Sequence, residues 1–262
     1  MRVLVTGAAR AIGAATAVEL AARGHHVVAT ARDPALLAAL DVAQRLALDV
    51  TDEASVRAVH RAAGEVDAVV NNAAITAYGP LESLPAGLFA KVLETNVVGP
   101  LRVLQPVLAG WRHRGHGTVV NVSSVQGHVG TPLEGAYAAS KHALEALSES
   151  LHYELGHFGI RVVIVEPGFV APGMKPPPAY PFPAEYQPLA RQWAAGVDLL
   201  AGPDGRPGPE SVAAAVADAL EDPETPLRVE IGGDARLVLA TRRALGDGEF
   251  ERAMRQALRI DW

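Results

Sequence analysis

Cysteine is absent from this chain of 262 residues, and lysine occurs only three times. The missing cysteine excludes disulfide bonds and a thiolate nucleophile, although it does not identify the redox compartment. Positive charge is also scarce, because 23 Lys and Arg residues face 29 Asp and Glu residues and the formal net charge is −6. A surface that follows nucleic-acid phosphates is therefore not expected, and small molecules are the expected partners.

Long apolar runs are missing as well. No uninterrupted apolar stretch approaches the roughly 18 residues that mark a membrane-spanning helix, and "MRVLVTG" leads directly into a strand pattern instead of a charged and then apolar leader. The nine histidines show no metal-ligand spacing, so no metal site is expected. We expect a soluble, cytoplasmic protein without a membrane span.

Short apolar segments alternate regularly with longer segments of helical period. The predicted strands are "RVLVT", "HVVAT", "VDAVVN", "GTVVNVSS", "IRVVIVEPG" and, nearer the end, "PLRVEIG". Because strands that are apolar throughout are buried on both faces, the pattern predicts a Rossmann-like, doubly wound α/β fold with helices on both faces of a parallel sheet. Residues 1–262 are predicted to form one domain. Ligands of such sheets bind beyond the carboxyl ends of the strands, where the loops after Thr6, Thr30, Asn71, Ser124 and Glu166 would meet.

One segment departs from this alternation. Residues 171–209 are rich in proline and glycine, with a short helical pattern around "LARQWAAGV". Prolines restrict the backbone and leave few ladder hydrogen bonds, so we expect a substrate lid, with a solvent-exposed linker as the alternative. Residues 210–262 then predict C-terminal helices around "PESVAAAVADAL", "DARLVLATRRAL" and "GEFERAMRQAL", together with the last strand.

A glycine-containing loop follows the first strand. The segment "TGAARAIG", residues 6–13, opens a predicted helix, and backbone N–H groups at a helix N-terminus form an anion site suited to a pyrophosphate. Gly7 would make the turn, and Gly13 would let the helix lie close to the sheet. Ala11 stands where the related pattern has a glycine, which is tolerated if its φ is already helical. The candidate residues of this loop are Gly7, Arg10, Ala11, Ile12 and Gly13, and a plain glycine turn is the alternative.

The end of the second strand bears on the choice of cofactor. A dinucleotide-binding chain selective for NAD places an acidic residue here, against the ribose 2′-hydroxyl. This chain has Ala31 and Arg32 instead, and Arg10 in the glycine loop could hold a 2′-phosphate from the other side. We therefore favour NADP(H) over NAD(H), with two solvated surface arginines as the alternative. Asp33 is interpreted as the N-cap of the segment that follows.

Tyr137 and Lys141 stand four residues apart in "EGAYAASKHALEALSESLHYEL", a predicted helix. Residues at this spacing share one helical face, so the phenol and the ammonium can reach the same point. An isolated phenol titrates near about pH 10, and a neighbouring cation favours the phenolate. The pair therefore suits proton transfer, although a core tyrosine and a solvated lysine would explain either residue alone.

Seven motifs resemble those of the short-chain dehydrogenase/reductase family between Arg2 and about Val170. They are, in order, "TGAARAIG", "LDV", "NNAA", "TN", "SS", "YAASK" and "PG". The resemblance implies that Tyr137 is the general acid or base and that Lys141 binds the nicotinamide ribose and lowers the tyrosine pKa. It further implies that Ser124 hydrogen-bonds the substrate oxygen. Asn96 resembles the residue that interrupts a central helix and anchors a water linking Lys141 to solvent.

The same resemblance extends the expected cofactor site. Asp49, followed by Val50, should contact the adenine edge, and Asn72 and Ala73 should pass by the adenosine ribose. In "NNAA", Ala74 replaces the more usual final glycine. The resemblance also implies contacts to the nicotinamide carboxamide from a further loop, at Pro167, Gly168 and Val170. In that loop, Pro172 stands where the family often has a threonine.

Together these features predict an NADP(H)-dependent oxidoreductase acting on a carbonyl or secondary alcohol of a lipophilic small molecule. "YPFP", Trp193 and the Leu-rich C-terminal helices suggest an apolar substrate surface, resembling members that act on steroid- or retinoid-like ketones. Gln126 and His128 follow Ser124 and are either substrate contacts or surface residues of the loop. A protein that senses NADP without turnover is the alternative function. By analogy with the family, helices beginning near Pro100 and Gly135 would pair subunits in a homodimer or homotetramer.

Overall fold

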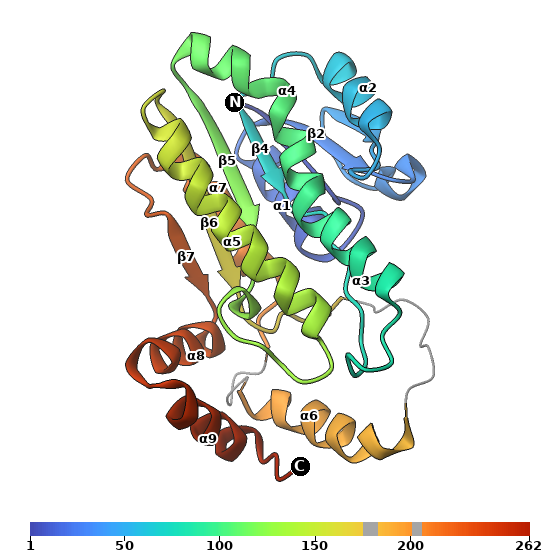
Figure 1. Ribbon diagram of the computed structural model, residues 1–262. Helices are drawn as coiled ribbons and strands as arrows, with labels where there is room; N and C mark the ends of the chain where they lie inside the picture. Colours follow the sequence, from blue (N-terminus) through green and yellow to red (C-terminus); the bar gives the residue numbers. More distant parts are fainter. Residues whose placement is uncertain (175–182, 201–205) are drawn as a thin grey trace.

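Seven parallel strands form the centre of the molecule, in the order β3-β2-β1-β4-β5-β6-β7 (Figure 1). The computed structural model describes residues 1–174, 183–200 and 206–262. The strands are β1 (Arg2–Val5), β2 (His26–Ala31), β3 (Gln44–Ala47), β4 (Ala68–Asn71), β5 (Gly117–Val122), β6 (Ile160–Pro167) and β7 (Arg228–Ile231). Every neighbouring pair runs parallel, which confirms the predicted Rossmann-like sheet.

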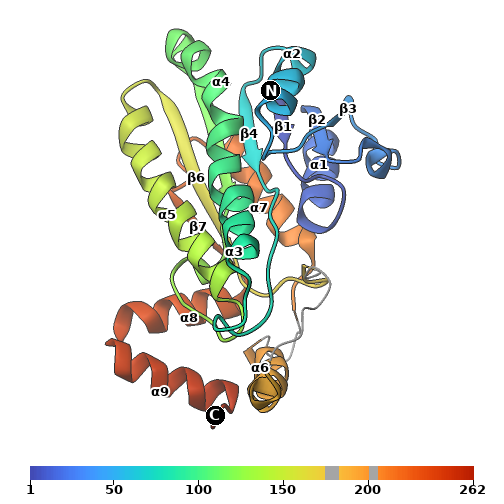
Figure 2. The same cartoon turned by 45° about the vertical axis from the view of Figure 1, so that its right-hand side comes forward.

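Successive residues of the strands point to opposite faces and build two apolar layers. Val3 and Val5 belong to the layer that also contains α1 (Ala11–Ala22) and α7 (Pro209–Glu221). Leu4 belongs to the opposite layer. The helices that pack there are α2 (Glu53–Ala63), α4 (Gly99–Arg114) and α5 (Gly135–Gly156). Helices therefore cover both faces of the sheet, as the doubly wound prediction requires (Figure 2).

β3 is the strand that the sequence analysis misses. It has four residues and lies at the edge of the sheet, where β2 is its one partner among the described strands. Its side chains alternate between half-buried and exposed, so the continuous apolar pattern of the central strands is lacking. A short, charged edge strand of this kind protects a sheet from pairing with other chains, and its polar composition hides it from a search for apolar runs.

Three helices lie beyond the carboxyl ends of the strands (Figures 1 and 2). They are α6 (Gln187–Leu200), α8 (Gly233–Ala244) and α9 (Asp247–Leu258). α6 is preceded by the short segment η4 (Ala184–Tyr186), and it packs against α9 in an apolar cluster with Trp193 and Leu258. The helical pattern predicted within residues 171–209 is thus confirmed. Residues 175–182 and 201–205 of that segment lie outside the described residues, and the lid function stays a prediction.

α4 and α5, the helices expected to pair subunits, pack in the same layer of the fold. α4 follows α3 (Ala86–Leu93) and the short segment η2 (Glu94–Val98). The homodimer or homotetramer stays a prediction. Among the described helices, none has both the length and the apolar character that crossing a membrane requires.

Candidate active site

A cavity of about 1490 Å³ opens at the carboxyl edge of the sheet. The predicted site residues that line it are Gly7, Arg10, Ala11, Ile12, Arg32, Asp49, Val50, Asn72, Ala73, Ser124, Tyr137, Lys141, Pro167, Gly168 and Val170. Gly13 and Asn96 do not line the cavity and lie behind its wall. The parallel sheet explains the convergence, since all its carboxyl ends meet at one edge.

The glycine loop follows β1 and is held against the loop after β4. Gly7 has φ +68°, and a Cβ there would come within 2.8 Å of the Cα of Ala73, so only glycine fits. A Cβ on Gly13 would collide with the carbonyl oxygen of Gly7 and the side chain of Asn72. Gly13 therefore permits close contact with the glycine loop itself, and not with the sheet as the sequence analysis expected.

Thr6 and Asn72 tie these two loops together. The Thr6 hydroxyl accepts hydrogen bonds from the backbone N–H groups of Asn72 and Ala73, both at 3.0 Å. In return, Asn72 Nδ2 donates to the carbonyl oxygens of Thr6 at 2.9 Å and Gly7 at 3.2 Å. The glycine loop and the "NNAA" segment after β4 are thus held together as one unit at the cavity wall.

Arg10 and Arg32 are exposed at the cavity rim. Within the described residues, neither guanidinium has a hydrogen-bond or ion-pair partner. Nearby Asp49 accepts hydrogen bonds from the Thr51 backbone N–H at 2.9 Å and hydroxyl at 2.7 Å, and these bonds, with a smaller effect of Arg32, lower its pKa. Asp33 accepts a hydrogen bond from the Ala35 N–H at 3.0 Å, which confirms it as an N-cap, here of the short segment η1 (Pro34–Leu37).

Ser124, Tyr137 and Lys141 come together where β5 ends and α5 begins. Ser124 caps the short segment η3 (Val125–Gly127) by accepting the Gln126 N–H at 3.2 Å. Tyr137 and Lys141 lie on consecutive turns of α5, and the Lys141 Nζ is 5.5 Å from the centre of the Tyr137 ring. The ammonium is buried and donates to the Val122 carbonyl at 2.7 Å. The predicted helical face thus brings a phenol, an ammonium and a hydroxyl to one end of the cavity.

Asn96 lies in η2, a single π-helical turn between α3 and α4, so the expected interruption of a central helix is confirmed. Its Oδ1 accepts from the Ile75 N–H, and its Nδ2 donates to the Ile75 carbonyl and to the Ser140 hydroxyl, all at 2.9 Å. Ser140 in turn donates to the Tyr137 carbonyl at 2.7 Å. Asn96 therefore connects the loop after β4 to the turn that carries Tyr137. The expected bound water stays a prediction.

Comparison with known proteins agrees with this geometry. The family model of the short chain dehydrogenases matches residues 1–178. The chain is 42% identical over 179 residues to the oxidoreductase YusZ of Bacillus subtilis, a match covering 63% of each protein. It is 33% identical over 255 residues to human retinol dehydrogenase 8, covering 86% of this chain and 79% of that protein.

A solved structure gives the same answer for the fold. A short-chain dehydrogenase from Streptomyces avermitilis superposes with a TM-score of 0.83 at 33% identity, covering 100% of this chain and 99% of that one. This chain belongs to the short chain dehydrogenase family. Where this chain differs from the sequence-based expectations, it differs as one member of that family.

Ala11 of this short chain dehydrogenase does not have the helical φ that the sequence analysis required. Its φ is +46°, in the left-handed region, where a Cβ is unfavourable by an amount of order 1 kcal/mol. It is the first residue of α1, after an extended Arg10 whose side chain makes no cap hydrogen bond. The N–H groups of the first helical turn have no partner within the helix, so they remain available to an anion in the cavity.

The pKa of Tyr137 differs from the expected direction. Burial raises the pKa of Tyr137, the negative charge of Glu134 raises it further, and interaction with the Ser124 hydroxyl acts in the opposite direction. Burial also lowers the pKa of Lys141 to about 8, against the effect of Glu145. Burial and Glu134 thus raise the pKa of Tyr137 in this structure, and the lowering of that pKa by Lys141 stays a prediction.

The loop after β6 is held by a residue that the sequence analysis missed. Asp234, buried in the first turn of α8, accepts the Phe169 N–H at 2.7 Å, and a Cβ on Gly168 would collide with its carboxylate. The "PG" pair thus needs its glycine for the approach of α8. The expected contacts of Pro167, Gly168 and Val170 with a nicotinamide carboxamide stay predictions. No local motif marks Asp234, since its partner is 65 residues away.

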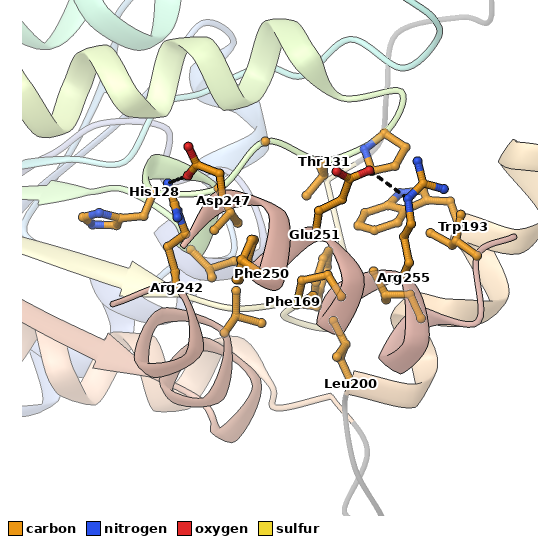
Figure 3. Close-up of a pocket in the computed structure, with 18 of the residues that line it drawn as sticks. His128, Thr131, Phe169, Trp193, Leu200, Arg242, Asp247, Phe250, Glu251 and Arg255 are labelled. Atoms are coloured by element: carbon orange, nitrogen blue, oxygen red, sulfur yellow. Dashed lines mark hydrogen bonds and ion pairs between the residues drawn. The ribbon is translucent and has the colours of Figure 1, made fainter. Parts of the chain in front are cut away.

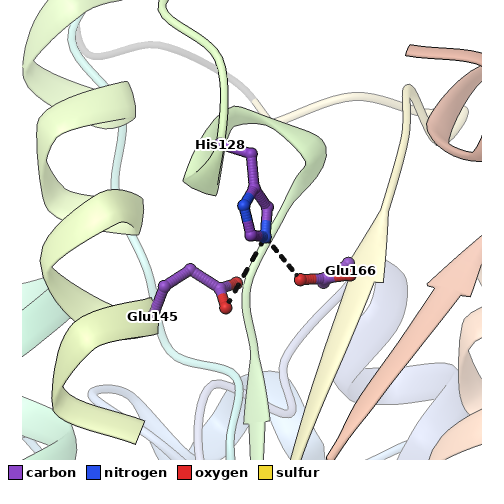
Figure 4. Close-up of side chains that lie close together, drawn as sticks. All are labelled: His128, Glu145 and Glu166. Carbon is purple, nitrogen blue, oxygen red and sulfur yellow. Dashed lines mark hydrogen bonds and ion pairs between the residues drawn. The ribbon is translucent and has the colours of Figure 1, made fainter. Parts of the chain in front are cut away.

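His128, for which the sequence suggests either a substrate contact or a surface residue of the loop, belongs to a charged cluster (Figure 4). Its Nε2 lies 2.7 Å from Glu166 and 3.8 Å from Glu145. The Nε of Arg228 lies 3.2 Å from both carboxylates. Although the tertiary fold brings a histidine and two glutamates together, the Arg228 guanidinium already pairs with both carboxylates, and we assign no metal there.

A second cavity of about 600 Å³ lies between α6, α8, α9 and the loop after β5 (Figure 3). Phe169 and Trp193, whose ring centres are 6.1 Å apart, line both cavities. The apolar surface expected at Trp193 therefore lies at the boundary between the two cavities. The expected contribution of "YPFP" falls on residues 180–183, of which only Pro183 is described.

Proposed function

We propose that the protein is an NADP(H)-dependent oxidoreductase that interconverts a carbonyl and a secondary alcohol of a lipophilic small molecule. The observation that carries this proposal is one continuous cavity lined by the glycine loop at one end and by Ser124, Tyr137 and Lys141 at the other. That arrangement suits a long dinucleotide whose reactive ring meets a proton donor.

The residues present fit a nicotinamide dinucleotide. Unpaired N–H groups open α1 beside the cavity, and such groups favour a pyrophosphate. Arg10 and Arg32 would hold the 2′-phosphate of NADP, since their guanidinium groups have no partners within the described chain and lie at the cavity rim. Asp49 would contact the adenine, and Asn72 and Ala73 the ribose. When bound, the nicotinamide gives or takes a hydride.

The chain's own groups would position the substrate and move a proton. The Ser124 hydroxyl would hydrogen-bond the substrate oxygen, and the Tyr137 hydroxyl would donate a proton to it during reduction. A raised pKa keeps the phenol protonated at neutral pH, which suits a proton donor. Lys141, with a pKa of about 8, keeps its ammonium at neutral pH and would bind the nicotinamide ribose.

The apolar part of the cavity supports a lipophilic substrate. Phe169, Met174, Trp193 and Val197 line the side of the cavity that faces α6. Apolar walls with a few polar groups are typical of small-molecule sites. Retinol dehydrogenase 8, which matches this chain over 255 residues, has a name that indicates a lipophilic alcohol.

The test follows NADPH absorbance with a panel of ketones. Tyr137→Phe should lower kcat/KM at least about 100-fold, the usual scale of general acid catalysis. Tyr153→Phe is the matched control, because Tyr153 lies on the same helix with 83% exposure. Turnover unchanged in Tyr137→Phe would contradict the proposal. Tight NADPH binding without turnover of any ketone would favour the NADP-sensing alternative.

Cofactor preference has its own test. Removing both arginines, as Arg10→Ala with Arg32→Ala, should lower kcat/KM for NADPH at least about tenfold and leave NADH nearly unchanged. Arg57→Ala on α2 is the control, since Arg57 is exposed and pairs only with Glu53 within the described chain. Equal efficiency of the wild-type enzyme with NADH would contradict the NADP assignment.

A further inference from the structure

Two acceptor side chains lie in the reaction cavity beside Tyr137. Gln126 and Glu134 line the same cavity as Ser124 and Tyr137. Gln126 Nε2 donates to Glu134 Oε2 at 2.8 Å, and the Thr131 hydroxyl donates to the same oxygen at 3.5 Å. The amide and the carboxylate therefore hold each other in a defined orientation at the reacting end of the cavity.

Glu134 is close enough to Tyr137 to act on it. It is the N-cap of α5, three residues before Tyr137, and residues three apart on a helix are neighbours. Its negative charge raises the pKa of Tyr137 and also that of Tyr78. A polar group of the substrate that meets Glu134 would thus lie near the substrate oxygen that meets Tyr137.

Acceptor capacity in this pair is left unused by the protein. Gln126 is 4% exposed, and its Oε1 has no hydrogen-bond partner among the described residues. Glu134 Oε1 likewise receives no hydrogen bond in the described part of the chain. A buried amide oxygen without a partner is destabilising, and both oxygens belong to side chains that line the cavity. The Gln126 Oε1 has almost no accessible surface, so the Glu134 Oε1 is the acceptor that a donor arriving with the ligand can reach.

A bracing role for the loop after β5 does not explain this arrangement. Bracing is achieved by Gln126 Nε2 and Glu134 Oε2 alone. A carboxylate beside Tyr137 also opposes formation of the phenolate, because like charges repel. Its presence is explained if its free oxygen binds substrate.

We propose that Glu134, held in place by Gln126, is a specificity-determining residue whose free oxygen accepts a hydrogen bond from a hydroxyl group of the substrate. The substrate is then a ketone with a hydroxyl close to its carbonyl, or the corresponding diol, on a lipophilic body. This inference rests on the proposed function. In the reduction, the carbonyl carbon gains hydride from NADPH, the oxygen gains a proton from Tyr137, and the products are the diol and NADP⁺.

A neutral hydroxyl fits this place better than an ammonium. The buried Lys141 ammonium is 5.5 Å from the Tyr137 ring centre, and it would repel a second cation next to the reacting carbon. A hydroxyl donates to Glu134 without this repulsion. The apolar body of the substrate would lie along Phe169 and Trp193, which line the same cavity.

The experiment compares two ketones that differ by one hydroxyl, α-hydroxyacetophenone and acetophenone, with the full chain and NADPH. The wild-type enzyme should prefer the hydroxyketone at least about tenfold in kcat/KM, as expected for a hydrogen bond to a buried or charged acceptor. Glu134→Gln and Gln126→Leu should each remove most of this preference, measured in each variant as the ratio of kcat/KM for the two ketones.

Glu154→Gln is the matched control, since Glu154 is exposed on the same helix, and it should keep the wild-type preference. A purely structural role would alter the turnover of both ketones together and leave their ratio unchanged. Equal efficiency with the two ketones in the wild-type enzyme would overturn this inference and leave the proposed function intact.

A binding measurement covers the case in which neither ketone is reduced, which would count against the proposed function itself. Calorimetry of each ketone with the NADP⁺-loaded chain then decides the inference. Tighter binding of the hydroxyketone that is lost in Glu134→Gln supports the site. Equal binding, or a preference kept in both variants, overturns it.

Discussion

Asp234 accepts a hydrogen bond from the Phe169 N–H at 2.7 Å and thereby joins α8 to the loop after β6. The contact brings a C-terminal helix to the wall of the reaction cavity, because Phe169 lines that cavity. Gly168 also depends on it, since any side chain there would meet the same carboxylate. The C-terminal part of the chain is thus part of the site's support.

Asp234→Ala should lower the free energy of unfolding by about 1–3 kcal/mol, because it leaves a partly buried N–H without its acceptor. Urea denaturation measures this change. Asp247→Asn is the control, since the Asp247 side chain is 91% exposed and should shift stability by less than about 0.5 kcal/mol. Equal stability of Asp234→Ala and the wild type would show that the contact is not structural.

Gly13→Ala should destabilise the protein by more than about 1 kcal/mol and weaken cofactor binding, because its Cβ would collide with backbone and with Asn72. Gly110→Ala is the matched control inside α4, where the nearest atom to a Cβ is 3.8 Å away. The control should be neutral or more stable by up to about 1 kcal/mol. Thermal melting with and without NADPH checks both, and a harmless Gly13→Ala would contradict the packing argument.

Ala11→Gly should change stability in the opposite direction from an ordinary substitution of glycine for alanine in a helix. The φ of +46° at Ala11 is relieved by glycine, so stability should stay unchanged or rise by about 1 kcal/mol. Ala15→Gly, also in α1, should instead lower stability by about 0.5–1 kcal/mol. Chemical denaturation of the two variants side by side gives the comparison. Destabilisation of similar size in both would argue against a left-handed Ala11.

Lys141 should produce a rise of stability with pH. Burial lowers its pKa from 10.5 to about 8, so between these values the unfolded chain binds more protons than the folded one. Stability contributed by Lys141 therefore increases from about pH 8 to pH 10.5. The wild type should gain stability relative to Lys141→Met over this interval in urea titrations. A constant difference would contradict the burial effect.

His128 should make stability fall as the pH rises, the reverse of Lys141. Its hydrogen bond to Glu166 raises its pKa above 6.5, helped by Glu145 and opposed by burial and Arg228. The stabilisation is then complete below pH 6.5 and is lost as pH rises through the raised value. His128→Gln should cost up to about 1 kcal/mol at acidic pH and less at alkaline pH. A cost that grows with pH would contradict the ion pair.

Local patterns determined much of this protein without any structure. Tyr137 and Lys141 share a face because four residues make about one turn of a helix, and the glycine loop follows β1 because a strand and a helix need a tight turn there. The central strands were found because both their faces are apolar, whereas the half-exposed β3 lacked that pattern.

Only the tertiary structure decided properties that depend on distant neighbours. The pKa of Tyr137 is raised by burial and by the charge of Glu134, which helical spacing does not reveal. Gln126 reaches Glu134 through a loop, and Asp234 reaches Phe169 across 65 residues. Hydrogen bonding along a helix is set by residues nearby in the sequence, but burial and charge are set by whichever elements pack together.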